Sequence, residues 1–531
     1  MTPVPPPRTI AVVGAGTMGA GIAQLACQSG ARTLLHDPDA DALARGLELI
    51  HAHLARAVER GRLTKADATG ANERLDPAPT LADLSEAELV IEAAPESLEL
   101  KRALFAELST IVDDDCVLAT NTSSLLVTAI AAAAHHPERV VGMHFFNPAP
   151  VMRLLEVVAG EQSAEDPLAR ARAAGEAMGK EVILAADGPG FLVNRCNRPF
   201  ALEALKLLQE GIAPLADIDT ICRLGGGFRM GPFELMDLVG VDVGLDISRS
   251  FYEQSFGESR WRPSPITTRM VAAGRLGRKA GQGYYDYSHG PYRPADPEPL
   301  APAKSGAGLI VIAGNTVLGA ELAEAASDAG WDVRTPAEAR GEVPFLILDC
   351  TLGEEPEAPL EGGPQAICCA AGSLAALDPE GAAVGFHALP PLAAASLVEL
   401  TRGPDRAESA AAAAEDFFAT LGKHVAWVKD APGLVLGRIV CQVVNEASFA
   451  LGEGVGSAQD IDLGMTAGLN YPRGTLHWAD TIGLDHVTAV LDALMGERGE
   501  ERYRTAPALR QLAWSGRLGQ QTGEGFFAYE D

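Results

Sequence analysis

The sequence repeats itself, and this repeat constrains the fold more than any other feature. Motif residues of the first half recur 243 positions later: His144 as His387, Glu156 as Glu399, Asp187 as Asp430, Asp217 as Asp460, Gly231 as Gly474 and Gly240 as Gly483. The closing segments GRLGRKAGQGYYDY and GRLGQQTGEGFFAY agree at an offset of 242. A fixed offset is the signature of a duplicated structural unit. We therefore expect a helical domain that is present twice.

A strand, a glycine turn and a helix open the first copy. Residues 10–13 (IAVV) form a short apolar run typical of a buried strand, the turn GAGTMG follows directly, and a helical pattern covers residues 20–29. Residues 33–35 predict a second strand, which ends near Asp37. This order of elements is typical of a Rossmann-type α/β domain that binds a dinucleotide at the turn.

The glycines of the turn and Asp37 have separate expected roles. Gly14 permits the tight turn, Gly16 lets the backbone approach a pyrophosphate, and Gly19 lets helix and strand pack closely. The helix N-terminus favours phosphate. Asp37 is placed to bind a ribose 2′-OH and would repel the extra phosphate of NADP, so NAD is the expected cofactor; a purely structural turn is the alternative. The expected cofactor-binding residues here are Gly14, Gly16, Thr17, Met18, Gly19 and Asp37.

Three further strand patterns lead into segments that contain polar residues. Residues 89–91 lead into EAAPE, residues 116–119 into NTSS, and residues 140–143 into HFFNP. In a doubly wound sheet, ligands bind beyond the carboxyl ends of the strands. We therefore expect these three segments to line one crevice.

Several motifs together resemble the 3-hydroxyacyl-CoA dehydrogenase family over roughly residues 8–290: GAGTMG, IEAAPE, NTSSL, HFFNP with LLEVV following, and GPGFLVNR. The resemblance implies NAD-dependent oxidation of (S)-3-hydroxyacyl-CoA to 3-ketoacyl-CoA. It also implies an α/β Rossmann-type NAD-binding domain plus an all-α C-terminal domain, followed here by a degenerate second copy of both. A non-catalytic NAD-binding or structural relative and a dehydrogenase of a free hydroxy acid are the alternatives. Nothing in the sequence resembles a hydratase domain.

The candidate base is His144. Oxidation of a secondary alcohol requires a base for the hydroxyl proton, and a histidine can serve near neutral pH if a carboxylate fixes its tautomer. Glu156, twelve residues after His144, is the expected orienting partner. By resemblance, Ser123 and Asn194 complete the catalytic set by binding the oxygens of the substrate. The alternatives are a structural histidine, a helix cap at Ser123 and a helix-surface residue at Asn194.

The resemblance also implies that Glu96, Lys101 and Lys279 lie near the cofactor. Exposed lysines without a function are the alternative for the two cations. Glu92 could belong to the structure around the site and is left without a role.

A basic stretch stands out in an acidic chain. The formal net charge is −29, yet residues 45–65 form a helical pattern with an excess of basic residues. A cationic helix could bind the phosphates of coenzyme A. Arg56 and Arg60 are therefore candidate substrate-binding residues together with Ser123, and a solvated helix face is an equally open alternative.

The second copy keeps the helical domain but loses the cofactor residues. Residues 309–319 match the first glycine turn at an offset of 300, so some 57 residues are missing before His387, and the basic helix has no counterpart. Four expected site residues are replaced: Gly16 by Thr316, Asp37 by Thr335, Ser123 by Gly372 and Asn194 by Gly437. We expect one active site per chain, with His387 and Glu399 as relics or packing residues.

The expected domains follow from the repeat: an NAD-binding domain (1–187), a helical domain (188–290), a Pro-rich linker (291–307), a reduced Rossmann-like domain without cofactor (308–429) and a second helical domain (430–531). The layout resembles longer family members, among them enzymes of phenylacetate catabolism that act on 3-hydroxyadipyl-CoA, and 3-hydroxybutyryl-CoA dehydrogenases. The sequence does not separate these two substrates. We expect the helical domains to pair within the chain, and a homodimer stays open.

Composition excludes several kinds of partner. The acidic charge is unsuited to nucleic acid or an anionic membrane. No apolar run approaches a membrane-spanning length, and the N-terminus lacks the apolar core of a signal peptide. The eight cysteines include no CxxC pair, and no spacing indicates a metal site. We expect a cytoplasmic protein that acts on an acyl-CoA and holds no metal.

Overall fold

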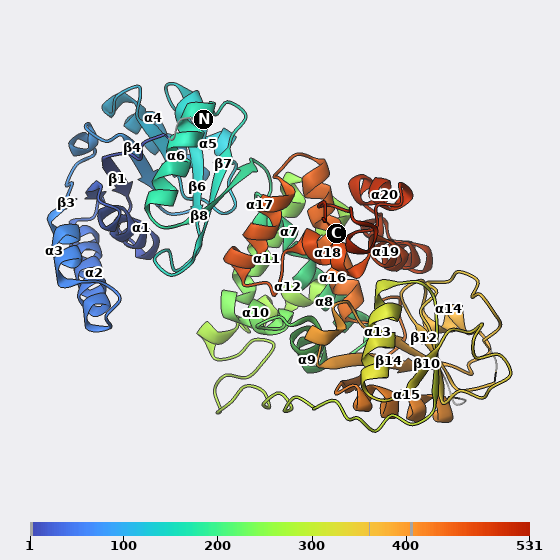
Figure 1. The fold of residues 1–531 in the computed structure, drawn as a ribbon. Coiled ribbons are helices and arrows are strands. Elements are labelled where there is room, and N and C mark those ends of the chain that lie inside the picture. Colours follow the sequence, from blue (N-terminus) through green and yellow to red (C-terminus); the bar gives the residue numbers. More distant parts are fainter. Residues whose placement is uncertain (1–3, 361, 404–406, 531) are drawn as a thin grey trace. The chain divides into compact units, whose positions relative to one another are not determined.

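The computed structural model describes residues 4–360, 362–403 and 407–530. These residues form two compact units (Figure 1). The first unit covers the described residues up to Arg195 together with Gly454–Leu469, and the second covers the rest. No helix in the described part of the chain is long and apolar enough to cross a membrane.

The first unit is built on an eight-stranded sheet with the order β3-β2-β1-β4-β5-β6-β7-β8. All neighbouring strands are parallel except β6 and β7, which are antiparallel. The strands are β1 (Thr9–Val13), β2 (Arg32–His36), β3 (Leu75–Pro77), β4 (Leu89–Glu92), β5 (Val117–Thr120), β6 (Val140–Phe145), β7 (Leu154–Ala159) and β8 (Glu181–Ala186). The helices are α1 (Thr17–Gln28), α2 (Ala40–Glu59), α3 (Lys65–Glu73), α4 (Leu98–Ile111), α5 (Val127–Ala131), α6 (Glu165–Ala177) and the short α7 (Val193–Cys196) at its end. The predicted Rossmann-type domain is confirmed.

The basic stretch is not one continuous helix. The predicted helical pattern over residues 45–65 was wrong in extent, because α2 ends at Glu59 and α3 begins only at Lys65. Gly61 adopts a φ of 66° between the two helices, a left-handed conformation that glycine tolerates. Thr64 then caps α3, since its side chain accepts a hydrogen bond from the backbone N–H of Asp67.

The second unit contains a reduced copy of the same sheet, with the order β10-β9-β11-β12-β13-β14-β15. Only β13 and β14 are antiparallel, as β6 and β7 are in the first sheet. The strands are β9 (Leu309–Ala313), β10 (Asp332–Arg334), β11 (Leu346–Asp349), β12 (Gln365–Cys368), β13 (Val384–His387), β14 (Leu397–Arg402) and β15 (His424–Trp427), with α13 (Val317–Asp328), α14 (Leu374–Leu377) and α15 (Glu408–Thr420). The described residues between β10 and β11 contain no counterpart of α2, α3 or β3. The absence of the basic helix was predicted from the shorter sequence.

Two sets of helices complete the second unit. The first set is α8 (Arg198–Glu210), α9 (Leu215–Gly226), α10 (Pro232–Val239), α11 (Val241–Gln254) and α12 (Pro265–Ala272). The second is α16 (Leu436–Gly452), α18 (Thr475–Ile482), α19 (Leu484–Arg498) and α20 (Pro507–Trp514). The predicted duplication of the helical domain is therefore present in the structure.

The two helical sets pack against each other through α8 and α16. Arg438 of α16 is fully buried, and its guanidinium lies 3.0 Å from Glu203 and 2.7 Å from Glu210 of α8. Burying an arginine is unfavourable unless carboxylates compensate its charge, so this contact needs both glutamates in place. The expected pairing of the helical domains within one chain is seen here.

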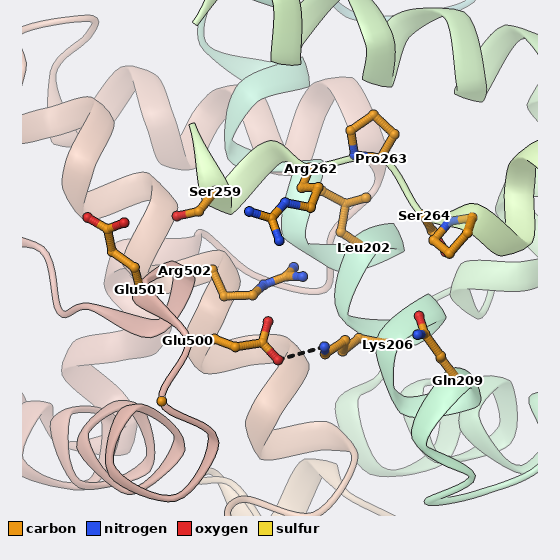
Figure 2. Close-up of a pocket in the computed structure, with 12 residues that line it drawn as sticks. Leu202, Lys206, Gln209, Ser259, Arg262, Pro263, Ser264, Glu500, Glu501 and Arg502 are labelled. Carbon is orange, nitrogen blue, oxygen red and sulfur yellow. Dashed lines mark ion pairs between the residues drawn. The ribbon is translucent and has the colours of Figure 1, made fainter. Parts of the chain in front are cut away.

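A pocket of about 410 Å³ lies where the two helical sets meet (Figure 2). Lys206 of α8 lines one side and forms an ion pair of 2.6 Å with Glu500, which follows α19. None of the predicted site residues lines this pocket.

The two copies exchange helices across their sheets. In the first unit, α17 (Ala458–Leu463) and the π-helical turn η6 (Gly464–Gly468) come from the second copy, yet they pack on β8 and β7. In the second unit, α9 comes from the first copy and packs on β14. Each sheet is therefore covered in part by a helix of the other copy.

Candidate active site

The glycine turn has the geometry of a phosphate site. Gly14 has a φ of 101°, and a Cβ there would lie 2.6 Å from the carbonyl oxygen of Ala93. A Cβ at Gly19 would lie 1.7 Å from the carbonyl oxygen of Gly14. A Cβ at Gly16, in contrast, would meet no atom within 4 Å. Gly16 is the N-cap of α1 and has no side chain to cap it, so no cap side chain occupies the N–H groups of the first turn, which begins with Thr17 and Met18.

Asp37 stands beside this turn. Its Oδ2 accepts a hydrogen bond of 2.9 Å from the N–H of Ala15, and its Oδ1 accepts one of 2.9 Å from the N–H of Asp39. The carboxylate thus fixes the backbone of the glycine turn. The residues present fit an NAD dinucleotide.

His144 and Glu156 lie opposite each other in β6 and β7. The distance from Nδ1 of His144 to Oε2 of Glu156 is 2.6 Å. The other carboxylate oxygen, Oε1, accepts hydrogen bonds from the N–H groups of Leu192 at 3.2 Å and Val193 at 2.9 Å. Glu156 is fully buried and His144 is 7% exposed. Because Glu156 is held at both oxygens, the imidazole has a fixed orientation.

The ring of His144 is enclosed by aromatic side chains. Ring centroids lie 4.6 Å away at Phe146 and 5.9 Å away at Phe191. No hydrogen bond to Nε2 of His144 is found among the residues that the structure describes. This nitrogen is therefore available to a substrate hydroxyl.

The turn η6 supports these aromatic residues from the second copy. A Cβ at Gly468 would lie 2.6 Å from Leu154 in β7, 3.5 Å from Val193 and 3.6 Å from the ring of Phe146. A Cβ at Gly464 would lie 2.7 Å from Val193. The backbone of η6 thus packs closely on the residues around the His144–Glu156 pair, and glycine at these two positions permits this.

The loop that carries Ser123 is held by Glu96. Oε1 of Glu96 accepts hydrogen bonds from Thr122 Oγ1 at 2.5 Å, the N–H of Ser123 at 3.2 Å and Ser124 Oγ at 2.9 Å. Burial opposes the charge on Glu96, but Lys101 and these hydrogen bonds outweigh it and hold the pKa of Glu96 below its usual value. The hydroxyl of Ser123 has no partner among the described residues and is available to a ligand.

Lys101 is buried inside this arrangement. Its Nζ lies 2.8 Å and 2.9 Å from the carboxylate oxygens of Glu92 and 3.4 Å from Glu96, and its side chain is 0% exposed. Glu92 also accepts hydrogen bonds from Thr120 Oγ1 at 2.7 Å and from the N–H of Ala94 at 2.6 Å. Glu92, which had no role in the sequence interpretation, is thus the centre of a buried network. Its position at the carboxyl end of β4 was the available signal.

The remaining candidates lie in different surroundings. Asn194 is half-buried in α7, directly after Val193, whose N–H is bonded to Glu156. Lys279 belongs to the second unit, where its Nζ lies 2.7 Å from Asp242. Arg56 and Arg60 are exposed, in the last turn of α2 and at its C-cap.

The second copy preserves the register but not the contacts. His387 lies opposite Glu399 in β13 and β14. Glu399 accepts the N–H of Val435 on Oε2 and that of Leu436 on Oε1, whereas Glu156 accepts the equivalent two N–H groups on Oε1 alone. Nε2 of His387, however, lies 3.0 Å from Nε2 of His486. A Cβ at Gly437 would lie 2.1 Å from the ring of His387, so the imidazole occupies space that a side chain here would fill.

The glycine turn of the second copy is capped by a side chain. Oγ1 of Thr316 accepts a hydrogen bond of 3.1 Å from the N–H of Gly319 and caps α13. The side chain therefore uses a donor that the first turn leaves free for phosphate.

The first unit is a Rossmann sheet with an open glycine turn and an oriented histidine at the ends of its strands. This combination is typical of a nucleotide-dependent dehydrogenase. The chain belongs to the 3-hydroxyacyl-CoA dehydrogenase family. Residues 9–188 match the NAD binding domain of that family, and residues 190–287 and 433–529 both match its C-terminal domain. The predicted family, the NAD-binding domain and the repeated helical domain are confirmed.

Relatives of two lengths are similar to the chain. The 3-hydroxyadipyl-CoA dehydrogenase of Escherichia coli K12 is 38% identical over 508 residues, which are 95% of this chain and 97% of the relative. A probable 3-hydroxybutyryl-CoA dehydrogenase of Deinococcus radiodurans is 41% identical over 276 residues, 52% of this chain and 99% of the relative. The crystal structure of a 3-hydroxybutyryl-CoA dehydrogenase from E. coli K12 has a TM-score of 0.81 at 36% identity and covers 96% of this chain and 99% of its own.

Proposed function

We propose that the chain oxidises (S)-3-hydroxyacyl-CoA to 3-ketoacyl-CoA, with His144 as the general base and Glu156 as its orienting partner. The observation that carries this proposal is the 2.6 Å contact between Nδ1 of His144 and Glu156, which leaves Nε2 without a partner among the described residues. Glu156 keeps the proton of the imidazole on Nδ1, so the lone pair of Nε2 faces the substrate. When His144 takes the hydroxyl proton, the nearby carboxylate stabilises the imidazolium.

Ser123 and Asn194 would bind the oxygens of the substrate. The free hydroxyl of Ser123 is presented by the loop that Glu96 holds, and Asn194 sits next to the backbone that Glu156 holds. Both residues are thus positioned by carboxylates of the site, which keeps the reacting carbon in a fixed place.

The cofactor residues are proposed as Gly14, Gly16, Thr17, Met18, Gly19 and Asp37, with Glu96, Lys101 and Lys279 as further candidates. NAD, when bound, supplies the hydride acceptor. Because Lys101 is buried between Glu92 and Glu96, it would act by fixing the charge and position of Glu96 rather than by direct contact.

The proposed acyl group is that of 3-hydroxyadipyl-CoA or of 3-hydroxybutyryl-CoA. Relatives that match nearly the whole chain carry both names, a 3-hydroxyadipyl-CoA dehydrogenase of E. coli K12 by sequence and a 3-hydroxybutyryl-CoA dehydrogenase of E. coli K12 by structure, so both acyl groups are tested. A panel of 3-hydroxybutyryl-, longer 3-hydroxyacyl- and 3-hydroxyadipyl-CoA, followed by NADH absorbance, ranks these substrates by kcat/KM. Failure to oxidise any of them, or to consume NADH with acetoacetyl-CoA, would contradict the proposal and favour a non-catalytic relative.

Arg56 and Arg60 are proposed to bind the phosphates of coenzyme A. Both side chains are exposed near the end of α2. Reversing the charges of Arg56, Arg60 and Arg62 together should raise the KM for the acyl-CoA and leave the KM for NAD unchanged. An unchanged KM for the acyl-CoA would show that this helix end is only a solvated surface.

A further inference from the structure

The degenerate copy contains a buried group of metal-binding side chains. Cys368 ends β12, His387 ends β13, and His486 lies on α19. The sulfur of Cys368 and one ring nitrogen of each histidine all lie within 4.8 Å of one another. The three residues are 3%, 0% and 1% exposed, so the group is closed to bulk solvent.

This group is a new arrangement rather than a remnant of the first site. No side-chain hydrogen bond joins His387 to Glu399, its partner in register, in the described structure; the imidazole of His387 is hydrogen-bonded to His486 instead. Gly437, at the position of Asn194, leaves room for the turned ring. His486 stands at the position of Val243 in the first copy. Replacement of a valine by a buried histidine is unfavourable unless the imidazole gains a partner.

The partners within the protein do not satisfy these imidazoles. The two rings share a single hydrogen bond between their Nε2 atoms, and both Nδ1 atoms are buried without a partner in the described structure. A buried polar atom without a partner destabilises the folded chain.

We propose that Cys368, His387 and His486 bind one d10 metal ion, Zn²⁺ or Cu⁺. Imidazole and thiolate are the ligands that these borderline-to-soft ions prefer. Ligand atoms around a tetrahedral zinc lie about 3.3–3.8 Å apart, so side-chain shifts of about 1 Å bring the three ligands onto one ion. Binding releases one proton, that of the Cys368 thiol, because the thiolate is the form that binds a metal ion.

The test uses the full-length chain, purified without a metal-affinity tag. Elemental analysis after dialysis should give about one zinc or copper per chain, and it distinguishes the two ions. Metal-free protein titrated with Co²⁺ should develop a thiolate-to-cobalt charge-transfer band that saturates at one equivalent. Cys368→Ser should remove that band, and His486→Val, which restores the residue of the first copy, should weaken metal binding at least tenfold.

Cys116→Ser is the matched control, because Cys116 is also buried and directly precedes β5, the strand of the first sheet that corresponds to β12. This variant should bind metal as the unaltered chain does. A native chain with no bound metal and no cobalt–thiolate band overturns the proposal, and so does equal binding by the Cys368 and Cys116 variants. The first two readouts come from the unaltered chain, so they decide the matter even where a variant fails to fold.

Discussion

Nδ1 of His144 lies 2.6 Å from Oε2 of Glu156, across the antiparallel pair of strands β6 and β7. The equivalent pair in the second copy, His387 and Glu399, has the same register but no such contact. Strand pairing alone therefore does not bring the two side chains into contact. Side chains outside the sheet decide whether the histidine contacts the glutamate, because Gly437 in place of Asn194 leaves room for the ring of His387 to turn away from Glu399.

The first prediction concerns Lys180, whose hydrogen bonds to two backbone carbonyls recur at Lys423 in the second copy. Its Nζ donates to the carbonyl oxygens of Ala149 and Met152, which follow the His144 strand, as Lys423 does to Leu392 and Ala395. Lys180→Met and Lys423→Met should each lower the free energy of unfolding by about 2–4 kcal/mol, since each leaves two carbonyls without their donor.

The kcat values should differ between these two variants. Lys180→Met should also lower kcat about tenfold, because the loop beside His144 loses its anchor. Lys423→Met should leave kcat unchanged. Melting curves and NADH assays measure both effects, and equal kcat values for the two variants would contradict the assignment of the active site to the first copy.

Gly468 tests whether the second copy supports the first active site. Gly468→Val places a side chain against Leu154, Val193 and Phe146, and displacing the residues around His144 should lower kcat up to about 100-fold. Gly225→Val is the matched control, since Gly225 occupies the equivalent place against Leu436. It should change stability only. A Gly468 variant with normal kcat would show that η6 merely covers the sheet.

Asp37 should determine the choice of cofactor. Asp37→Ala removes a charged acceptor for the ribose hydroxyl, an interaction worth about 1.5–3 kcal/mol, and removes the repulsion of a 2′-phosphate. The ratio of kcat/KM for NAD to that for NADP should fall at least tenfold. Because Asp37 also fixes the N–H of Ala15, some activity with NAD should be lost as well. An unchanged ratio would exclude Asp37 from the ribose site.

The raised pKa of Asp219 should make the stability of the chain depend on pH in a specific way. Burial raises the pKa of Asp219 to about 7, although it accepts hydrogen bonds from Phe233, Glu234 and Tyr285. The folded chain keeps this proton up to about pH 7, whereas the unfolded chain releases it near pH 4. The contribution of Asp219 to stability therefore falls as pH rises, by about 3 kcal/mol between pH 5 and pH 8.

The variant Asp219→Asn has no carboxyl group to titrate at this position. Its melting temperature should be lower overall, since an amide cannot accept all three hydrogen bonds, but it should vary less between pH 5 and pH 8 than that of the unaltered chain. Parallel pH profiles for the two proteins would contradict a raised pKa at Asp219.

Much of the fold could be predicted from the sequence, because the repeat offset and the strand–turn–helix pattern are local signals. The offset correctly identified which residues of the two copies are equivalent. It could not predict that η6 of the second copy packs on the first sheet and α9 on the second, since equivalence says nothing about which copy covers which sheet.

The site was less predictable than the fold. Motifs predicted roles for His144, Glu156 and Ser123. The buried network at Glu92 could not be predicted, because Lys101, Thr120 and Ala94 approach its carboxylate from three segments. The turn of His387 toward His486 depends on two substitutions, at Gly437 and at His486, that only the folded chain brings together.

The central claim is that each chain has one active site, built on His144 and Glu156 of the first copy. The most direct measurement is the kcat for reduction of acetoacetyl-CoA by NADH in His144→Gln, with Glu399→Gln as the second-copy control. We predict a loss of about 10²–10⁴-fold in the His144 variant and a kcat within about twofold of normal in the control. Near-normal turnover by His144→Gln, or comparable losses in both variants, would contradict the claim.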